Sequence, residues 1–168
     1  MTYERFEDLP VWKTAIELGR AVYLFTDRAA FKGQRSLRDQ LERAAVSVSN
    51  NIAEGFERGT TQELITFLYY ARGSAGEVRS MLSLIEGIEA FAVHAPEIST
   101  LKSVAESCSR QLRRWAESLQ NSDIAGTRYL DDRVRRREDQ KKRAKAFEAH
   151  LADIRAAASS KRREHESG

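Results

Sequence analysis

The sequence predicts an all-α fold, an antiparallel up-down-up-down four-helix bundle over residues 1–120 with a basic, partly helical C-terminal extension over residues 121–168. Apolar residues recur at intervals of three and four along four separate segments, which is the spacing of one face of a helix. Only two prolines and nine glycines interrupt the 168 residues. The connections between the four segments span at most about ten residues, and short connections join antiparallel neighbours.

The first helix is expected between residues 8 and 27. Asp8 is predicted to cap its N-terminus by accepting backbone N–H bonds, and Pro10 suits the first turn because its missing N–H is not needed there. Its apolar stripe is predicted to contain Trp12, Ala15, Ile16, Gly19, Val22 and Tyr23, widened by Leu18, Ala21 and Phe25.

The second and third helices carry capping-box patterns, Ser36 with Asp39 and Thr60 with Glu63. Gly59 is expected to stop the second helix. Both segments have regular apolar spacing, which predicts their buried faces. These faces contain Leu37, Leu41, Ala44, Ala45, Val48 and Ile52 in the second helix and Leu64, Phe67, Leu68, Ala71, Ala75, Val78, Leu82 and Ile85 in the third.

The fourth helix is expected to open at Pro96 and to continue to about Gln120. Its stripe contains Ile98, Leu101, Val104, Ala105, Cys108, Leu112, Trp115 and Leu119. The single cysteine, Cys108, excludes an internal disulfide and is interpreted as a small buried hydrophobic residue. The small residues 73–76 of the third helix are predicted to permit close approach of another helix.

Residue types that carry catalysis or bind metals are sparse. The three histidines are His94, expected near the end of the third helix, and His150 and His165 in the extension. None has a cysteine or carboxylate at a recognisable catalytic offset, and neither Glu-x-x-His nor His-Glu-x-x-His occurs. We therefore expect no enzymatic activity, no metal and no cofactor, and a protein that acts by binding other macromolecules.

The positive charge is concentrated in the extension. Residues 1–127 carry 15 basic and 17 acidic side chains, a net charge of −2, whereas residues 128–168 carry 13 basic and 8 acidic side chains, a net charge of +5. Eight cations lie close together and are predicted to contact nucleic acid: Arg133, Arg135, Arg136, Arg137, Lys141, Lys142, Arg143 and Lys145. The alternative is a charged tail that only improves solubility.

Two sets of residues in the bundle are further candidates. Arg110, Arg113 and Arg114 form a basic patch on the fourth helix, flanked by Glu106 and Glu117, and are predicted to bind nucleic acid. Tyr69, Arg72 and Arg79 align with Ile65 and Gly76 on a second face of the third helix. That strip suits a subunit interface, a contact with RNA, or a solvated face paired with Glu63 or Glu86.

Polar residues in the second helix leave two interpretations open. Asn50, Asn51 and Glu54 either lie on the solvent face or bond to a neighbouring helix, or they form a subunit contact. No segment is long and apolar enough to span a membrane, and residues 1–8 lack the pattern of a secretory signal. We therefore expect a cytoplasmic location and no membrane partner.

Four ordered motifs carry a resemblance to a known family. They are FEDLPVW at residues 6–12, LRDQLERAAVSV at residues 37–48, NIAEGF at residues 51–56 and FLYYARGS at residues 67–74. Over residues 4–120 the chain resembles the four-helix-bundle family of intervening-sequence proteins, encoded within bacterial large-subunit ribosomal RNA genes. The same broad family includes the accessory variability determinant proteins of diversity-generating retroelements.

The resemblance implies an antiparallel four-helix bundle, a ring-shaped homopentamer and a basic surface for nucleic acid. Its retroelement branch implies binding to a reverse transcriptase and its template RNA. We therefore expect a non-enzymatic RNA-binding accessory protein for a partner reverse transcriptase. A structural protein-interaction module, or a ribosome-associated intervening-sequence protein without such a partner, remains the alternative.

Overall fold

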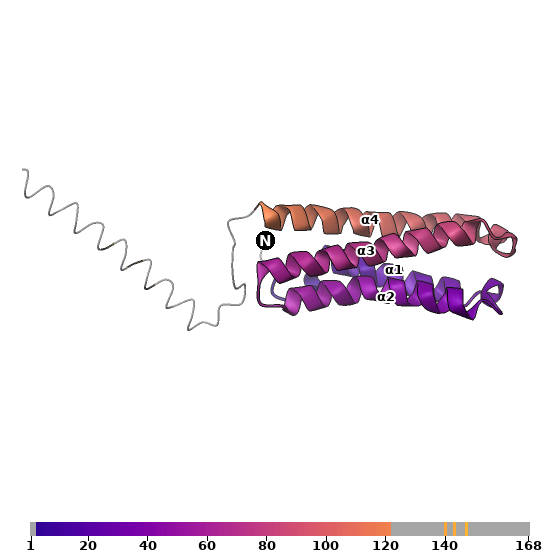
Figure 1. Ribbon diagram of the computed structural model, residues 1–168, viewed down its shortest axis with the longest axis horizontal. Coiled ribbons are helices and arrows are strands. Elements are labelled where there is room, and N and C mark those ends of the chain that lie inside the picture. Colours follow the sequence, from indigo (N-terminus) through magenta and orange to yellow (C-terminus); the bar gives the residue numbers. More distant parts are fainter. Residues whose placement is uncertain (1–2, 122–139, 141–142, 144–146, 148–168) are drawn as a thin grey trace, which may run out of the picture. The chain divides into compact units, whose positions relative to one another are not determined.

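The computed structural model describes residues 3–121 together with Gln140, Arg143 and Phe147. Its four long helices are α1 (Pro10–Thr26), α2 (Arg35–Glu57), α3 (Thr61–Glu86) and α4 (Ala95–Gln120). Short 3-10 helices precede or connect them, η1 (Phe6–Asp8), η2 (Ala29–Phe31) and η3 (Glu89–His94). Figure 1 shows the four long helices side by side, with successive connections at alternate ends. The predicted all-α, up-down-up-down bundle is therefore confirmed.

The core runs along the axis of the bundle, because each long helix buries one stripe of apolar residues against the other three. Aromatic rings close one end of it: Phe31 lies edge-on to Phe25 and Phe91, with ring centroids 5.2 and 4.8 Å away. Trp12 and Trp115 are half-buried and pack against the core from outside. Cys108 is completely buried, which confirms its interpretation as a core residue.

Helix α1 begins and ends where predicted, but two details differ. Its N-cap is Leu9, and no side chain accepts a hydrogen bond there, because Asp8 is already part of η1. The buried face is also rotated from the predicted stripe. Leu18 and Phe25 lie at its centre with no exposed surface, while Tyr23 is 47% exposed. Tyr23 keeps its phenolic oxygen in water at the outer edge of α1, where burial would require a bonding partner.

Helix α2 begins one residue before its predicted start. Gly33 has a φ of +85°, a conformation that suits glycine, and the helix then starts at Arg35 after an N-cap at Gln34. Ser36 therefore lies inside the first turn, and the capping box predicted for it does not form. The helix stops at Glu57 with Arg58 as its extended C-cap, so Gly59 follows the stop and does not make it.

Thr60 caps α3 as predicted, but only one half of the capping box forms, because the Glu63 carboxylate accepts from the Thr60 hydroxyl and not from its backbone N–H. Thr60 Oγ1 accepts a hydrogen bond from the backbone N–H of Glu63 at 3.2 Å and donates to its carboxylate at 2.7 Å. At the predicted close approach, residues 73–76, the two glycines do not face another helix: a Cβ atom on Gly73 or Gly76 would have no atom of another described helix within 4 Å. The contact with α2 in this segment is made by Ser74, whose hydroxyl lies 2.9 Å from that of Ser47. The helix ends at Glu86, so His94 belongs to η3 and not to the end of α3.

The close approach between helices occurs instead at Gly55 of α2. A Cβ atom placed on Gly55 would lie 2.6 Å from the Cβ of Phe67 in α3, which is closer than two carbon atoms can pack. Glycine at this position lets the C-terminal end of α2 pack tightly against the first turns of α3. The connection between these helices, residues 58–60, is correspondingly short.

Candidate nucleic-acid interface

The antiparallel pairing of α3 and α4 brings two predicted sets of residues together. Tyr69, near the start of α3, accepts a hydrogen bond on its hydroxyl from Gln120 Nε2 at the end of α4, at 3.1 Å. At the opposite end, Lys102 Nζ donates to Glu86 at 2.8 Å. Between these two bonds lies one exposed surface, here named the α3/α4 face. Its predicted residues are Tyr69, Arg72, Arg79, Arg110, Arg113 and Arg114.

Carboxylates of α4 hold several of these arginines in place. Glu106 pairs with Arg110 on its own helix at 2.6 Å and reaches Arg79 of α3 at 3.9 Å. Glu117 pairs with Arg113 at 2.7 Å. The local neutralisation predicted for this patch is therefore present. The partner of Arg79 is Glu106, and not the predicted Glu63 or Glu86.

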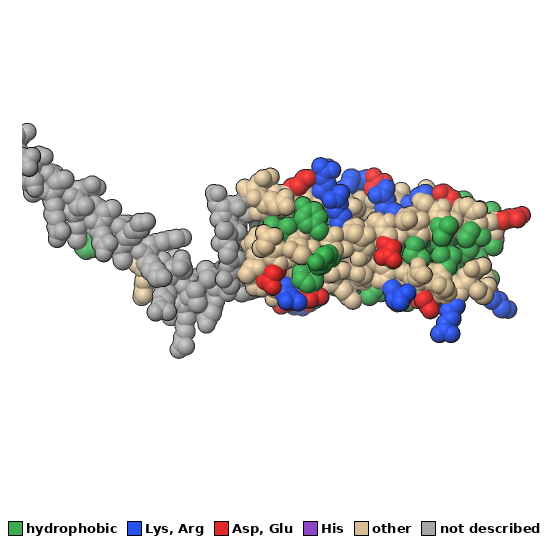
Figure 2. Space-filling view, viewed as in Figure 1, with side chains coloured by type: hydrophobic (Ala, Val, Ile, Leu, Met, Phe, Trp, Pro, Cys, Tyr) green, Lys and Arg blue, Asp and Glu red, His purple; other side chains and the backbone are tan. Residues whose placement is uncertain are grey.

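The α3/α4 face nevertheless keeps an excess of positive charge. Its five arginines face two glutamates, Glu106 and Glu117. Arg72 is half-buried and Arg114 is exposed, and neither forms an ion pair with another described residue. Figure 2 shows the basic side chains of α4 gathered along one edge of the bundle among a few acidic ones.

The guanidinium of Arg113 carries its charge at any physiological pH. The hydrogen bond from Arg113 to Glu117, with the nearby carboxylate charge, raises the pKa of the Arg113 guanidinium above its ordinary value. Ion pairs at this degree of exposure are screened by water and hold their partners weakly. A phosphate group can therefore replace a glutamate as the partner of an arginine, and it accepts two parallel hydrogen bonds from the guanidinium.

The predicted alignment on α3 holds for most of its members. Tyr69 is 41% exposed and faces α4, so its ring is available for stacking. Gly76 is exposed beside it. Ile65, one turn earlier, is buried, so the predicted strip is not exposed over its whole length.

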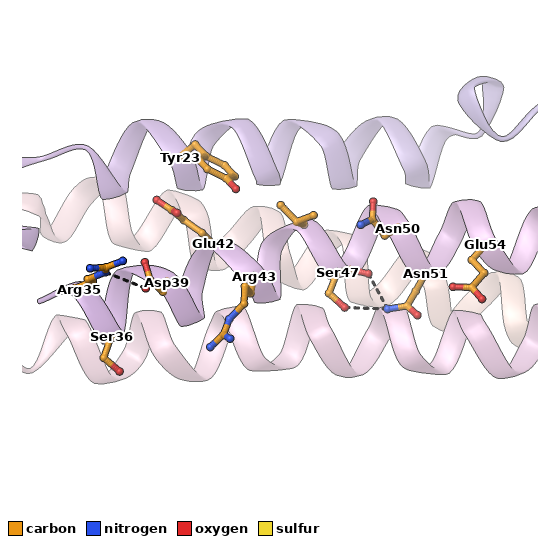
Figure 3. A pocket seen from close by; sticks show the side chains of 11 residues that line it. Tyr23, Arg35, Ser36, Asp39, Glu42, Arg43, Ser47, Asn50, Asn51 and Glu54 are labelled. Carbon is orange, nitrogen blue, oxygen red and sulfur yellow. Dashed lines mark hydrogen bonds and ion pairs between the residues drawn. The ribbon is translucent and has the colours of Figure 1, made fainter.

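The polar residues of α2 lie on a different surface, a depression of about 910 Å³ over the outer side of that helix (Figure 3). Asn51 Nδ2 donates to the backbone oxygen of Ser47 at 2.8 Å and contacts the Ser47 hydroxyl at 3.0 Å. That hydroxyl lies 2.9 Å from the hydroxyl of Ser74 in α3. Asn51 thus bonds within α2 and joins α3 only through Ser47, so the predicted direct bond from Asn51 to a neighbouring helix does not form.

The other two polar residues of that set are exposed. Glu54 pairs at 2.7 Å with Arg58, the C-cap of α2, while Asn50 lines the depression together with Tyr23 of α1. Sequence patterns gave no indication of this depression. Tyr23, which lines the depression, has the helical spacing of a core residue, so the sequence does not show that its side chain is exposed.

A family model described as 23S rRNA-intervening sequence protein matches residues 7–114. The chain belongs to this family. The matched range begins within η1, covers α1 to α3 and most of α4, and includes all six predicted residues of the α3/α4 face. It ends before the extension.

A solved structure supports the fold of this 23S rRNA-intervening sequence family member. It is the crystal structure of a protein with unknown function from the S23 ribosomal protein family of Bacteroides thetaiotaomicron. The two chains are 18% identical and superpose with a TM-score of 0.55, over 64% of this chain and 98% of the other. No curated protein matches the sequence.

The basic cluster predicted in the extension falls mostly outside the described residues. Arg133, Arg135, Arg136, Arg137, Lys141, Lys142 and Lys145 are among those not described, whereas Arg143 is helical and exposed. Phe147 is helical and 62% exposed. Of the predicted linker at residues 121–126, Asn121 alone is described, as a turn after α4. The predicted boundary between bundle and extension stays a prediction.

Within the part of the chain that the structure describes, no group of three or more His, Cys, Asp or Glu side chains is placed to hold a metal ion. No helix among the described residues is long and apolar enough to cross a membrane. The chemistry available on the α3/α4 face is therefore that of guanidinium groups, one tyrosine ring and two carboxylates. These groups bind anions and aromatic rings.

Proposed function

We propose that this 23S rRNA-intervening sequence family member is a non-enzymatic, cytoplasmic RNA-binding protein. In this proposal it self-associates as a homopentamer and organises RNA for a partner reverse transcriptase of a diversity-generating retroelement. The observation that carries RNA binding is the α3/α4 face, where five arginines outnumber two glutamates beside an exposed tyrosine. The family's connection to ribosomal RNA supports the class of partner. The pentamer and the reverse transcriptase rest on the resemblance of the sequence motifs.

The mechanism is electrostatic capture and positioning, in which this chain makes and breaks no covalent bond. Phosphates exchange with Glu106 and Glu117 as partners of the arginines, and each neutralised phosphate releases condensed counterions. Tyr69 offers a ring on which an unpaired base stacks, and Arg72 lies one turn away with its guanidinium free of described carboxylates. Cations of the extension add further phosphate contacts, and each copy in a ring multiplies them.

The test removes three charges from the α3/α4 face and compares the salt dependence of RNA binding. The full-length variant carries Arg110→Gln, Arg113→Gln and Arg114→Gln. Its matched control removes three exposed cations elsewhere, with Lys13→Gln, Lys32→Gln and Arg35→Gln. For single-stranded RNA we expect the slope of log K against log salt to become shallower by about 2 in the first variant, since each lost contact changes it by ~0.7.

The control variant is expected to change the slope much less, because Lys13, Lys32 and Arg35 do not lie on the α3/α4 face. Equal losses in the two variants would show that binding follows total charge and not this face. Absence of RNA binding by the wild-type chain at low salt would contradict the proposal altogether and would favour a protein-interaction module.

The assembly and the partner are tested separately. Light scattering of the purified full chain should give the mass of five copies, and any other closed number contradicts the pentamer. Co-expression with a reverse transcriptase from a neighbouring gene should yield a complex that contains both proteins and RNA. A gene inside a ribosomal RNA locus, with no such neighbour, would instead favour a ribosome-associated intervening-sequence protein.

A further inference from the structure

The outward side of α3, next to the α3/α4 face, carries little charge. The residues there that face away from the core are here named the outer strip of α3, and they are Gln62, Thr66, Tyr70, Gly73, Glu77, Ser80 and Leu84. Glu77 is the one charged residue among these seven, although 32% of all residues in the protein are charged. Figure 2 shows a mostly uncharged band along α3 beside the basic edge of α4.

Two consecutive tyrosines lie near the start of α3. Tyr69 is 41% exposed and accepts the hydrogen bond from Gln120, so it borders α4. Tyr70 is 57% exposed, and its ring makes a T-shaped contact with the ring of Phe67, with centroids 5.6 Å apart. Because Phe67 faces Gly55 of α2, the two tyrosines follow each other across the width of α3, from the α4 side toward the α2 side.

On the α4 side, arginines lie next to this tyrosine pair. Arg113 is close to the hydroxyl of Tyr69. Arg72 and Glu117 each lie three residues from the bonded pair of Tyr69 and Gln120, so the antiparallel helices place them at the same level. Glu117 is the carboxylate that holds Arg113 at 2.7 Å. Two arginines therefore lie at the level of one carboxylate, which leaves positive charge for a phosphate beside the tyrosine rings.

On the α2 side the balance of charge is reversed. The guanidinium of Arg58 lies 5.2 Å from the centroid of the Phe67 ring. Two carboxylates surround it, Glu54 at 2.7 Å and Glu63 at 3.7 Å. Of the two sides of the tyrosine pair, the α4 side is therefore the one with an excess of positive charge.

This one-sided arrangement matches an unpaired RNA strand. Such a strand has a charged backbone on one side and flat, uncharged bases on the other, and proteins bind it with cations along the backbone and aromatic rings under the bases. In a duplex the bases are paired and stacked on one another, and the phosphates of both strands lie outside. Exposed tyrosine rings beside a single row of arginines then have no base on which to stack.

We propose that this protein selects unpaired RNA over duplex RNA, and that Tyr69 and Tyr70 stack on two successive bases of the strand. Its phosphates lie along the arginines of the α3/α4 face, and its bases extend over α3. This inference rests on the RNA binding in the proposed function and adds Tyr70 and a class of RNA to it. Charge alone would favour a duplex, because a duplex has the higher density of phosphates. A preference for the unpaired strand therefore reports on the rings.

The test uses the full-length chain and fluorescence anisotropy with three labelled probes of equal length: an RNA strand of mixed sequence, the same strand paired with its complement, and an abasic strand of ribose phosphates. The wild-type chain should bind the unpaired strand most tightly. Tyr69→Leu and Tyr70→Leu should each weaken that binding about fivefold or more, because one base loses its stacking partner. Binding of the duplex and of the abasic strand should change by less than about twofold, because the phosphate contacts remain.

Two kinds of control separate stacking from other effects. Tyr69→Phe and Tyr70→Phe keep the rings and should bind the unpaired strand within about twofold of wild type. Tyr69→Phe also removes the hydroxyl that accepts from Gln120, so it shows whether that hydrogen bond contributes. Tyr23→Leu removes a tyrosine of similar exposure from α1 and should leave all three affinities unchanged. Circular dichroism should give wild-type helix content for every variant.

The outcomes distinguish this inference from the proposed function. Equal affinity of the wild-type chain for the unpaired strand and the duplex would overturn it, as would leucine variants that bind the unpaired strand like Tyr23→Leu. Equal losses for all three probes would also overturn it, because the substitutions would then disturb the whole face. If the triple variant of Arg110, Arg113 and Arg114 still shows its shallower salt slope in these cases, the proposed function stands. Absence of binding to every probe contradicts both.

Discussion

Gly55 and Gly73 are both helical glycines, yet the space around them predicts opposite effects of the same substitution. Gly55→Ala places a methyl group 2.6 Å from the Cβ of Phe67, so α2 and α3 must separate. We expect a loss of about 1–3 kcal/mol in the free energy of unfolding. Gly73→Ala meets no atom within 4 Å and should stabilise the fold by up to about 1 kcal/mol. Urea denaturation of both variants at low protein concentration checks the two signs.

The sequence alone suggested the wrong glycines for close packing. Gly73 and Gly76 stand beside other small residues, which is the usual pattern for helix contact, whereas Gly55 precedes the bulky Phe56. Spacing within one helix shows which residues share a face, but it does not show which neighbouring helix covers that face or how closely. A destabilising Gly73→Ala together with a neutral Gly55→Ala would contradict the packing described here.

Cys108 provides a prediction about pH. Its side chain has no exposed surface, and burial raises the pKa of the thiol from 9.0 to about 12. The folded state therefore keeps this proton up to about pH 12, while the unfolded state releases it from about pH 9 upward. The contribution of Cys108 to stability is thus fully present below pH 9 and is lost as the pH rises through this range.

A thiol reagent distinguishes these states directly. At pH 8 we expect no reaction of the native protein over the time in which the urea-unfolded protein reacts completely. Cys108→Ala should show a shallower decrease in unfolding free energy than wild type between pH 9 and pH 11. Rapid labelling of the native chain would show that α4 opens at Cys108.

At the scale of a whole helix, the two capping-box patterns make a matched pair. Thr60 caps α3 by accepting a hydrogen bond from the backbone N–H of Glu63, whereas Ser36 lies inside the first turn of α2 and caps nothing. Thr60→Ala should therefore lower the free energy of unfolding by about 1 kcal/mol, and Ser36→Ala should change it by less than about 0.5 kcal/mol. Thermal unfolding followed by circular dichroism measures both. Similar effects of the two substitutions would mean that side-chain capping does not govern the start of α3.

The helices themselves were predictable because burial of one face imposes a spacing of three to four apolar residues. Leu41, Ala45, Val48 and Ile52 of α2 are all completely buried, as their spacing predicts. The start of α2 was not predictable in the same way, since it depends on the turn at Gly33. For Tyr23, spacing predicted a place in the buried stripe of α1, but the residue is 47% exposed, because an aromatic residue at the edge of a stripe suits either position.

At the scale of the whole molecule, the arginines of the α3/α4 face could be predicted from the sequence more readily than the carboxylates that pair with them. Arg110, Arg113 and Arg114 could be grouped from one helix, and the pairing of Arg110 with Glu106 and of Arg113 with Glu117 follows from a spacing of four residues. The contact from Arg79 to Glu106 depends on the register between α3 and α4, which no pattern within one helix contains.

The division of charge along the chain leads to the last prediction. Residues 1–127 have a net charge of −2 and residues 128–168 a net charge of +5, while α4 and the core of the bundle are complete at Gln120. Truncation after Gly126 should therefore leave a folded bundle with wild-type helix content in residues 10–120. It should bind RNA more weakly, with a smaller salt dependence, because phosphate contacts made by the extension are removed.

A full-length variant separates charge from length. In it, glutamine replaces the eight clustered cations, Arg133, Arg135, Arg136, Arg137, Lys141, Lys142, Arg143 and Lys145. If these side chains contact phosphates, this variant should lose as much affinity as the truncated chain, and the remaining binding should depend on the α3/α4 face. Removing Arg110, Arg113 and Arg114 from the truncated chain should then abolish it. Undiminished binding by the truncated chain would assign RNA recognition to the bundle alone, because the extension would then contribute no measurable contact.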